Sequence, residues 1–318
     1  MEITELKSKI KSLVERHSEF VCEVLFILNK DHGKEIKIAD IDADDQEALK
    51  IDFLEHLEET IVNKDDLKIN DISRADERKN FIFRYDYEEQ PDNFELFNTI
   101  KTRDEFDTFS FAQDKLEEIF GVVFILNLND LTLISYKQNY PINLYKRDSK
   151  AMGFWKSEER LVQIPEDILK VYPNCDLFFL NDDLFIRNLK VLERQFNFEK
   201  IINKKANEAI ELIRTVDWIE DTTVFESRLN DLTFARKLAQ IGEHSIVLNN
   251  LDFSEVANFI DNFPLLRGKI NFNSTQNKVI LNTKKSQNLF LKLLNDDFLT
   301  SLLTEKNYDS ANKDLVDV

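Results

Sequence analysis

Hydrophobic positions recur with helical spacing in some parts of the chain and with the spacing of strands in others. The N-terminal stretch MEITELKSKIKSLVERHSEF predicts an amphipathic helix, and residues 43–62 predict a second helix with one apolar face. FVCEVLFILN and KEIKIADI flank Asp31-His32-Gly33, a turn sequence, and therefore predict a hairpin. FIFRYDYE predicts one more strand in this part of the chain.

Strand patterns dominate from Phe120 onward and helical patterns follow them. VVFILNLN and LTLISYKQN predict a hairpin around Asn129-Asp130, DLFFLN and LFIRNL predict another around Asn181-Asp182-Asp183, and RLVQIP adds a strand. Two short strands are expected in RGKINFN and KVILN. Helices are expected at residues 198–216, at 230–241 with Gly242 as the end, at 254–263 and at 286–303. Strands in runs followed by helices predict an α+β fold with a mainly antiparallel sheet.

The length and the local composition favour two domains. The chain has 318 residues, and 42% of them are hydrophobic, which suffices for a core in each of two average domains. The segment 88–115 is polar, contains Pro91 and is rich in Asp, as is typical of a boundary region. We therefore expect an acidic N-terminal α+β domain at 1–115 and a second α+β domain at 116–318.

Charge is distributed unevenly along this acidic chain, whose formal net charge is −18. Residues 1–130 carry 33 acidic and 17 basic side chains, whereas residues 131–318 carry 27 and 25. The stretch 264–295 contains no Asp or Glu, and its basic residues are Arg267, Lys269, Lys278, Lys284, Lys285 and Lys292. Because salt screens charges over about 8 Å, an acidic protein can still present a cationic surface. The alternative is a solvated strand and helix that merely lack acids.

Two other segments combine basic residues with features of nucleic-acid binding. SYKQNYPINLYKRDSKAMGFWKSEER interleaves Lys146 and Arg147 with aromatic residues, which could stack bases or be half-buried strand positions. RNLKVLERQFNFEKIINKK supplies Arg187, Lys190 and Arg194. If the segments converge, they would bind backbone phosphates without sequence preference and with a steep dependence on salt. The predicted DNA-binding residues are Arg267, Lys269, Lys278, Lys284, Lys285, Arg187, Lys190, Arg194, Lys146 and Arg147.

Motifs of catalysis are weak in this sequence. Five scattered glycines exclude a P-loop and a Rossmann fingerprint, and the four His and two Cys lack zinc-site spacing. We therefore predict no catalytic residue, metal site or cofactor, and lean against an enzyme. Asp31, Glu35 and Lys37 match a metal-dependent nuclease faintly, so a nuclease effector remains an alternative. The carboxylates within residues 86–89 are more simply the solvated end of a strand.

The sequence also bears on the compartment of the protein and on the partners of its acidic first part. Two cysteines, no signal-peptide pattern and no apolar run near the ~20 residues that a bilayer requires predict a cytoplasmic protein. The acidic residues of 1–130 could orient DNA by repulsion or dock on a basic protein surface. An interaction scaffold that binds only protein is therefore a second alternative.

One pattern in the second half resembles a known family. LFFLNDDLFIRNLKVLERQFNFEKIINKKANEAIELI, followed by FESRLNDLTFARKLAQI, combines a hairpin, a Phe-centred helix with the spacing F.F...I...A..A...I and an Arg-Lys-Leu-Ala helix. From about Gly121 to Asn282 the chain resembles the KwaB family of the Kiwa anti-phage defence system, first catalogued as a domain of unknown function. These residues are structural in type and contain no catalytic signature.

The resemblance implies a non-enzymatic effector with defined partners. Such a protein would bind incoming phage DNA and block its replication or transcription. It would work with a KwaA-like transmembrane subunit, which would recruit it to the inner face of the cell membrane, and it would assemble as a homodimer or a higher homo-oligomer. The implied DNA binding agrees with the basic segments found from the residues.

Overall fold

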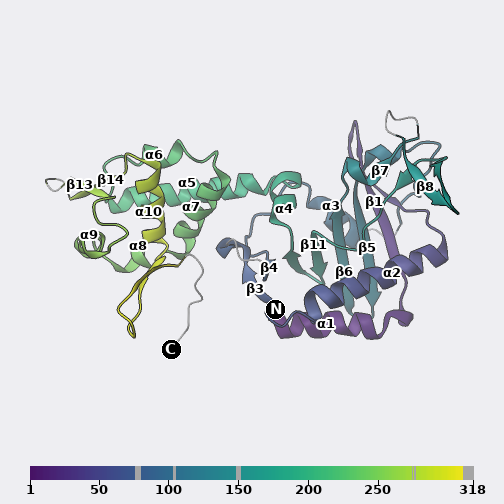
Figure 1. Cartoon of the computed structure of the whole chain (residues 1–318), viewed down its shortest axis with the longest axis horizontal. Coiled ribbons are helices and arrows are strands. Elements are labelled where there is room, and N and C mark those ends of the chain that lie inside the picture. Colours follow the sequence, from purple (N-terminus) through teal and green to yellow (C-terminus); the bar gives the residue numbers. More distant parts are fainter. Residues whose placement is uncertain (76–79, 103–104, 148–151, 274, 276, 311–318) are drawn as a thin grey trace. The chain divides into compact units, whose positions relative to one another are not determined.

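The computed structural model describes residues 1–318 except 76–79, 103–104, 148–151, 274, 276 and 311–318, and it confirms an α+β fold (Figure 1). The chain forms two compact units. Unit 1 contains Met1–Asp71, Asn80–Tyr85 and Asp92–Phe196. Unit 2 contains Ile72–Lys79, Asp86–Pro91 and Asn197–Val318.

Unit 1 is built on a large sheet with the strand order β2-β1-β5-β6-β11-β12-β4-β3 (Figure 1). Its neighbouring strands pair antiparallel except β3 and β4, which are parallel. The three predicted hairpins are confirmed as β1–β2, β5–β6 and β11–β12. The strands of this sheet are β1 (Cys22–Lys30), β2 (Gly33–Ile38), β3 (Lys68–Asp71), β4 (Phe81–Arg84), β5 (Ile119–Leu128), β6 (Leu131–Gln138), β11 (Leu177–Leu180) and β12 (Asp183–Ile186).

Helices and aromatic side chains cover both faces of the central strands. On one face lie α1 (Ile3–Glu15) and α2 (Ala43–Leu57), and Phe53 of α2 stacks on Phe124 of β5 with ring centroids 4.9 Å apart. On the other face, Phe97 of α3 (Glu95–Thr102) meets Tyr136 of β6 edge-on at 5.8 Å. Because both faces are buried, β1 and β5 are almost continuously apolar rather than alternating.

The structure places the division between the units at different residues from the predicted boundary between residues 115 and 116. That position lies inside unit 1, because β5 pairs with β1 over most of its length. The polar segment 88–115 does contain one crossing between the units, from Pro91 to Asp92, but it also contains α3, whose Phe97 is buried in unit 1. Composition placed the boundary too late because a short amphipathic helix is polar on average.

Unit 2 is mostly helical, and it also contains two small hairpins, β13–β14 and β15–β16 (Figure 1). Its elements are α5 (Phe198–Val216), α6 (Thr223–Glu226), α7 (Leu232–His244), α8 (Ile246–Asn250), α9 (Phe253–Asn262), β13 (Asn271–Asn273), β14 (Lys278–Ile280), α10 (Lys284–Leu294), β15 (Phe298–Thr300) and β16 (Asn307–Asp309).

Two helix ends predicted from the sequence of unit 2 are wrong. Gly242 does not end its helix, since α7 continues to His244, and a Cβ at Gly242 would lie 3.0 Å from Cβ of Ala209 in α5. Glycine at this position thus permits close helix packing. The last helix, α10, ends at Leu294 and not near residue 303. Asp296 follows with a φ of 57°, a left-handed conformation that stops the helix before β15.

Two segments from the first part of the sequence are fixed to α7 within unit 2. The Ser73 hydroxyl donates to Asp86 Oδ2 at 2.5 Å and lies 2.9 Å from Nε2 of His244. Gln240 Nε2 donates to the carbonyl of Ala75 at 2.7 Å. Between these two segments the chain contributes β4 to the sheet of unit 1.

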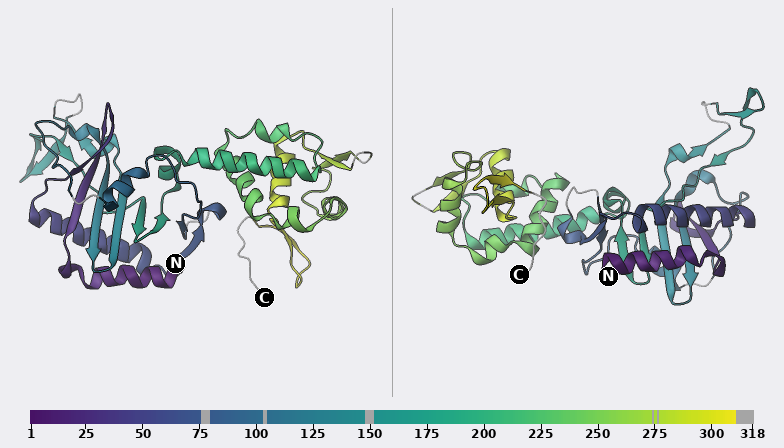
Figure 2. Two further views of the ribbon diagram at one scale, coloured as in Figure 1. Left: turned by 180° about the vertical axis from the view of Figure 1, so that it is seen from behind. Right: turned by 60° about the horizontal axis from the view of Figure 1, so that its bottom comes forward.

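A long ribbon connects β6 to β11. Within it β7 (Leu144–Tyr145) pairs with β10 (Ile168–Leu169), and β8 (Phe154–Ser157) pairs with β9 (Arg160–Gln163). The ribbon projects beyond one end of the large sheet (Figure 2). The last element of unit 1 along the chain is α4 (Leu189–Gln195), which follows β12. Within the described ranges, no helix has the length and apolarity needed to cross a bilayer.

Candidate functional site

The acid-free stretch places two exposed cations in the turns that follow α9. Arg267 and Lys269 are both exposed, and Lys269 Nζ donates to the carbonyl of Leu265 at 2.8 Å. Among the residues that the structure describes, neither side chain forms an ion pair with a carboxylate. Both charges are therefore available to an external anion.

The first turn of α10 gathers further positive charge. Lys284 and Lys285 are exposed there, and Thr283 caps the helix by accepting the backbone N–H of Ser286 at 3.0 Å. This first turn contains no acidic residue. A helix N-terminus already carries a positive partial charge, so two lysines at this end strengthen the local positive potential.

Arg228 is a cation near α10 that sequence reasoning missed. Its guanidinium donates to Gln287 Oε1 at 3.1 Å and to Asn288 Oδ1 at 3.0 Å. It also stacks on the Phe234 ring with its Cζ 3.8 Å from the centroid, and its Nη2 lies 3.5 Å from Asp231 Oδ2, a longer ion pair. Arg228 occurs in the mixed-charge run FESRLND, whose pattern contains no signal of this contact. We call Arg228, Lys284 and Lys285 the α10 cluster.

Two basic residues of the acid-free stretch are neutralised by acids that lie outside it. Lys278 Nζ lies 2.8 Å from Asp217 Oδ1, and Lys292 Nζ lies 2.7 Å from Asp309 Oδ2. Lys278, a predicted DNA-binding residue, thus has a carboxylate partner 61 residues earlier. A local charge count does not reveal such long-range pairs.

Three of the predicted residues of unit 1 lie on α4 or just before it. Lys190 and Arg194 are exposed and one helical turn apart, so they share a face. Arg187 precedes the helix, and its Nη1 lies 3.8 Å from Sγ of buried Cys175. We call Arg187, Lys190 and Arg194 the α4 strip. Burial raises the pKa of the Cys175 thiol, and the nearby charge of Arg187 opposes that shift.

A buried carboxylate fixes the start of α4. Asp176 accepts hydrogen bonds from the backbone N–H of Gln138 at 2.9 Å, from Asn188 Nδ2 at 2.9 Å and from Lys137 Nζ at 3.2 Å. Asn188 is the N-cap residue of α4. The buried ends of β6 and β11 therefore position the helix that carries the α4 strip.

The other two predicted residues of unit 1 lie on the ribbon. Lys146 Nζ pairs with Glu117 Oε1 at 2.7 Å, whereas Arg147 is exposed and its backbone N–H donates to Asp167 Oδ1 at 2.8 Å. The ten predicted residues thus belong to both units. Unit 2 contains Arg267, Lys269, Lys278, Lys284 and Lys285, and unit 1 contains Lys146, Arg147, Arg187, Lys190 and Arg194.

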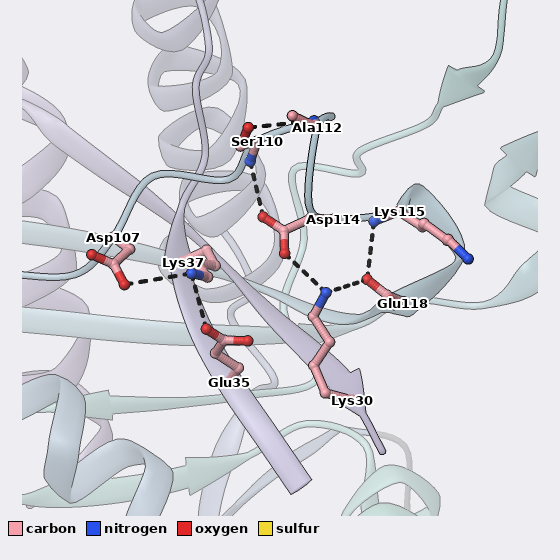
Figure 3. A network of polar contacts seen from close by, with 9 residues as sticks. All are labelled: Lys30, Glu35, Lys37, Asp107, Ser110, Ala112, Asp114, Lys115 and Glu118. Carbon is pink, nitrogen blue, oxygen red and sulfur yellow. Dashed lines mark hydrogen bonds and ion pairs between the residues drawn. The ribbon is translucent and has the colours of Figure 1, made fainter. Parts of the chain in front are cut away.

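The nuclease triplet takes part in an ion-pair network (Figure 3). Lys37 Nζ lies 2.9 Å from Glu35 Oε1 and 3.5 Å from Asp107 Oδ2, and the hydrogen bond with Glu35 raises the pKa of Lys37. Asp31 is exposed in the β1–β2 turn. Across the described residues, no group of three His, Cys, Asp or Glu side chains is placed to hold a metal ion.

A neighbouring part of the same network links β1 to the residues before β5 (Figure 3). Lys30 Nζ lies 2.5 Å from Glu118 Oε2 and 2.9 Å from Asp114 Oδ1. The hydrogen bond from Lys30 and then the backbone N–H of Lys115 lower the pKa of Glu118. These contacts are those of structural ion pairs.

Comparisons with known proteins identify the family. The family model described as "Kiwa protein KwaB-like" matches residues 116–304, which include four of the eight strands of the large sheet, the α4 strip and the α10 cluster. Kiwa protein KwaB of Escherichia coli O55:H7 (strain RM12579 / EPEC) is 29% identical over 319 residues, an alignment that covers all of both chains. No solved structure matches the chain. The chain therefore belongs to the KwaB-like family and is a component of the Kiwa anti-phage defence system.

Proposed function

We propose that this Kiwa component is a non-enzymatic effector that binds phage DNA through its backbone phosphates and thereby blocks replication or transcription. The observation that carries the proposal is the α10 cluster, in which Lys284 and Lys285 lie exposed at a helix N-terminus beside Arg228. Arg267, Lys269 and the α4 strip would add further phosphate contacts.

The helix dipole makes the α10 cluster informative. Acidic residues are favoured in the first turn of a helix, and a charge of the unfavourable sign costs about 0.3–1 kcal/mol. Lys284 and Lys285 therefore reduce the stability of α10 unless an anion is bound. Helix N-termini bind phosphate through backbone N–H groups as well as through the dipole. Phosphate is thus the ligand whose chemistry matches this arrangement.

Binding to phosphates alone predicts tolerance of sequence. The proposed contacts are those of Lys and Arg side chains with phosphate, and such contacts carry no base information. The interaction would follow counterion release, so the logarithm of the association constant should fall linearly with the logarithm of salt concentration. Such binding suits an effector that recognises incoming DNA irrespective of its sequence.

The decisive experiment measures binding of the full chain to labelled duplex DNA over a salt series with magnesium present, and then checks the DNA for cleavage. We expect binding to intact DNA, and we expect Lys284→Gln with Lys285→Gln to weaken it and to reduce the salt slope by about 1.8. The matched control is Lys204→Gln with Lys205→Gln, two adjacent helical lysines of unit 2 that are paired with Glu89, Glu208 and Glu243.

The control variant should retain the wild-type slope. Absence of wild-type binding at low salt would remove the proposed function altogether. Equal losses in the two variants would mean that general charge, rather than the α10 cluster, governs binding.

We further propose that a KwaA-like transmembrane subunit recruits this protein to the inner face of the membrane, with the acidic surface of residues 1–130 in contact with basic residues of that subunit. The net charge of −16 in this part of the chain supports the proposal. Full-length protein should co-purify with the membrane subunit at low salt and dissociate as salt rises. Retention that is independent of salt would contradict an electrostatic contact.

A further inference from the structure

Unit 2 contains a cavity that the proposed DNA contacts do not use. It has a volume of about 420 Å³ and is lined by residues of α8, α9, the end of α10 and the start of β15 (Figure 1). Its floor is apolar and buried, and consists of Val247, Val256, Leu293 and Phe298. Sites for small molecules are cavities of roughly 300–1,000 Å³ with a mostly apolar lining and a few polar groups. The volume and the floor of this cavity are therefore those of a small-molecule site.

One face of α9 forms a polar wall of the cavity. The cavity is lined on this side by Glu255, Asn258, Phe259 and Asn262. Their spacing of three and four residues places them on one side of the helix. Glu255 Oε2 accepts the backbone N–H of Asp252 at 2.9 Å, and Asn262 Nδ2 donates to Asn258 Oδ1 at 2.8 Å. The second carboxylate oxygen of Glu255 and the amide oxygen of Asn262 can therefore accept hydrogen bonds from a ligand.

A second carboxylate lies just beyond the end of α10. Asp296 is exposed and lines the cavity, and its side chain has no hydrogen bond or ion pair with the residues that the structure describes. The C-terminus of a helix carries a negative partial charge, because its last carbonyl groups lack partners within the helix. Lys292, in the last turn of α10, is already paired with Asp309. The potential at this end of the cavity therefore favours a cation.

The lining excludes two other classes of ligand. An anion would be repelled, because within the described ranges the cavity is lined by Glu255 and Asp296 and by no Lys or Arg. A metal ion needs several oxygen ligands around one point, and the described part of the chain places no three His, Cys, Asp or Glu side chains in that way. An aliphatic amine fits, since its methylene groups can lie on the apolar floor while its ammonium groups donate to carboxylates. Two carboxylates on separate elements match a molecule with more than one ammonium group.

We propose that this cavity binds an aliphatic polyamine. In the complex, one ammonium group donates to Glu255 and another to Asp296, and the alkyl chain covers Val256 and Phe298. The half-buried Phe259 ring adds a cation–π contact. The site lies at the opposite end of α10 from the α10 cluster, so this inference goes beyond the proposed DNA binding and is independent of it.

The test measures the binding of spermidine to the full chain by isothermal titration calorimetry with magnesium present. Magnesium competes for the open carboxylates of this acidic chain but cannot cover an apolar floor, so it suppresses non-specific binding. Wild-type protein should bind spermidine at one saturable site. Butylamine, which has one ammonium group, should bind about tenfold more weakly than putrescine, which has two, because it leaves one carboxylate without a donor.

Two conservative substitutions test the carboxylates. Glu255→Gln with Asp296→Asn should weaken spermidine binding about a hundredfold, because each change removes one charge-assisted hydrogen bond. The fold should be kept, since glutamine can still accept the backbone N–H of Asp252 and asparagine tolerates the φ of 57° at position 296. The matched control is Asp261→Asn with Glu305→Gln, which removes one Asp and one Glu from exposed positions of unit 2 outside the cavity lining. Its affinity should equal that of the wild type.

A further variant fills the cavity without changing its charge. Leu251 lines the cavity and is 41% exposed, so Leu251→Trp should leave the circular dichroism spectrum unchanged and abolish spermidine binding. Ile246→Trp is its control, because Ile246 is an exposed residue of α8 outside the lining. The inference is overturned if wild-type protein shows no saturable binding, if magnesium displaces spermidine completely, or if Leu251→Trp binds normally. Equal losses in the carboxylate variant and its control would also overturn it, because they would show attraction by general charge.

Discussion

The ammonium of Lys37 lies 2.9 Å from Oε1 of Glu35, two residues earlier on β2. The ion pair with Lys37 engages the Glu35 carboxylate, which a metal-dependent nuclease would need as a metal ligand. The lysine also contacts Asp107, so the arrangement holds β2 against the chain segment beside it. A structural role of Glu35 and Lys37 in holding these segments together therefore accounts for their contacts.

We predict that Glu35→Gln leaves the fate of DNA unchanged. Plasmid incubated with magnesium and either wild-type or variant protein should remain intact, because the carboxylate is paired with Lys37. Gel electrophoresis of the plasmid provides the measurement. If the wild-type protein instead cleaves the plasmid only in the presence of magnesium, and the variant does not cleave it, the nuclease alternative is established.

A second prediction concerns opposite effects of one substitution on stability and on binding. Lys284→Glu should raise the free energy of unfolding by about 0.5 kcal/mol, because a negative charge suits the N-terminus of α10, and should weaken DNA binding. Urea denaturation and the DNA titration test the two effects. Lys292→Glu is the matched control at the other end of α10, where it loses the pair with Asp309 and should lower stability. A Lys284 variant that loses both stability and binding would contradict the dipole argument.

Acid sensitivity should depend on Glu118. The pKa of its carboxyl is lowered by Lys30, so its stabilising contribution is present above the unfolded pKa, about 4.3, and is lost as pH falls through the folded value. Urea midpoints of wild-type protein should therefore decrease below that pH. Glu118→Gln should be less stable at neutral pH and should show a flatter decrease.

The control for this pH series is Asp52→Asn, which alters an exposed carboxyl on α2. Its curve should parallel that of the wild type. Parallel curves for Glu118→Gln and the wild type would show that Lys30 and Glu118 do not govern acid stability.

Close packing of a glycine against a tyrosine gives a fourth prediction. A Cβ at Gly121 in β5 would overlap the Tyr136 ring in β6, so Gly121→Ala should reduce the free energy of unfolding by about 1–3 kcal/mol. Urea denaturation measures this loss. In a Tyr136→Leu background the same substitution should cost less, because the two residues are coupled. Additive losses would exclude the steric explanation.

Local patterns predicted much of unit 1 correctly. The hairpins β5–β6 and β11–β12 combine apolar strands with Asn129 and Asn181, which adopt φ values of 54° and 55° that asparagine tolerates. The spacing of apolar residues in a strand and the residue types of a turn depend only on residues that are neighbours along the chain, so they can be recognised in a single sequence. The parallel pairing of β3 with β4 and the position of β4 beside β12 depend on distant segments.

The same distinction explains which parts of the candidate site were predictable. The absence of acids between residues 264 and 295 identified Arg267, Lys284 and Lys285 as cations, and the structure shows all three exposed. The neutralisation of Lys278 by Asp217 and the approach of Arg228 to α10 depend on tertiary packing. Gly242 was misread for a similar reason, since contact with Ala209 outweighs its local tendency to end a helix.

The chain leaves unit 1 for residues 72–79, returns to form β4, and leaves again for residues 86–91 before α3. Consequently, no single cut in the gene yields two fragments that each contain one complete unit. Truncated chains would lose either Ser73 and Asp86 from beside His244 or a strand from the sheet. Evolution by recombination faces the same constraint, so the two units should be inherited together and diverge as a single module.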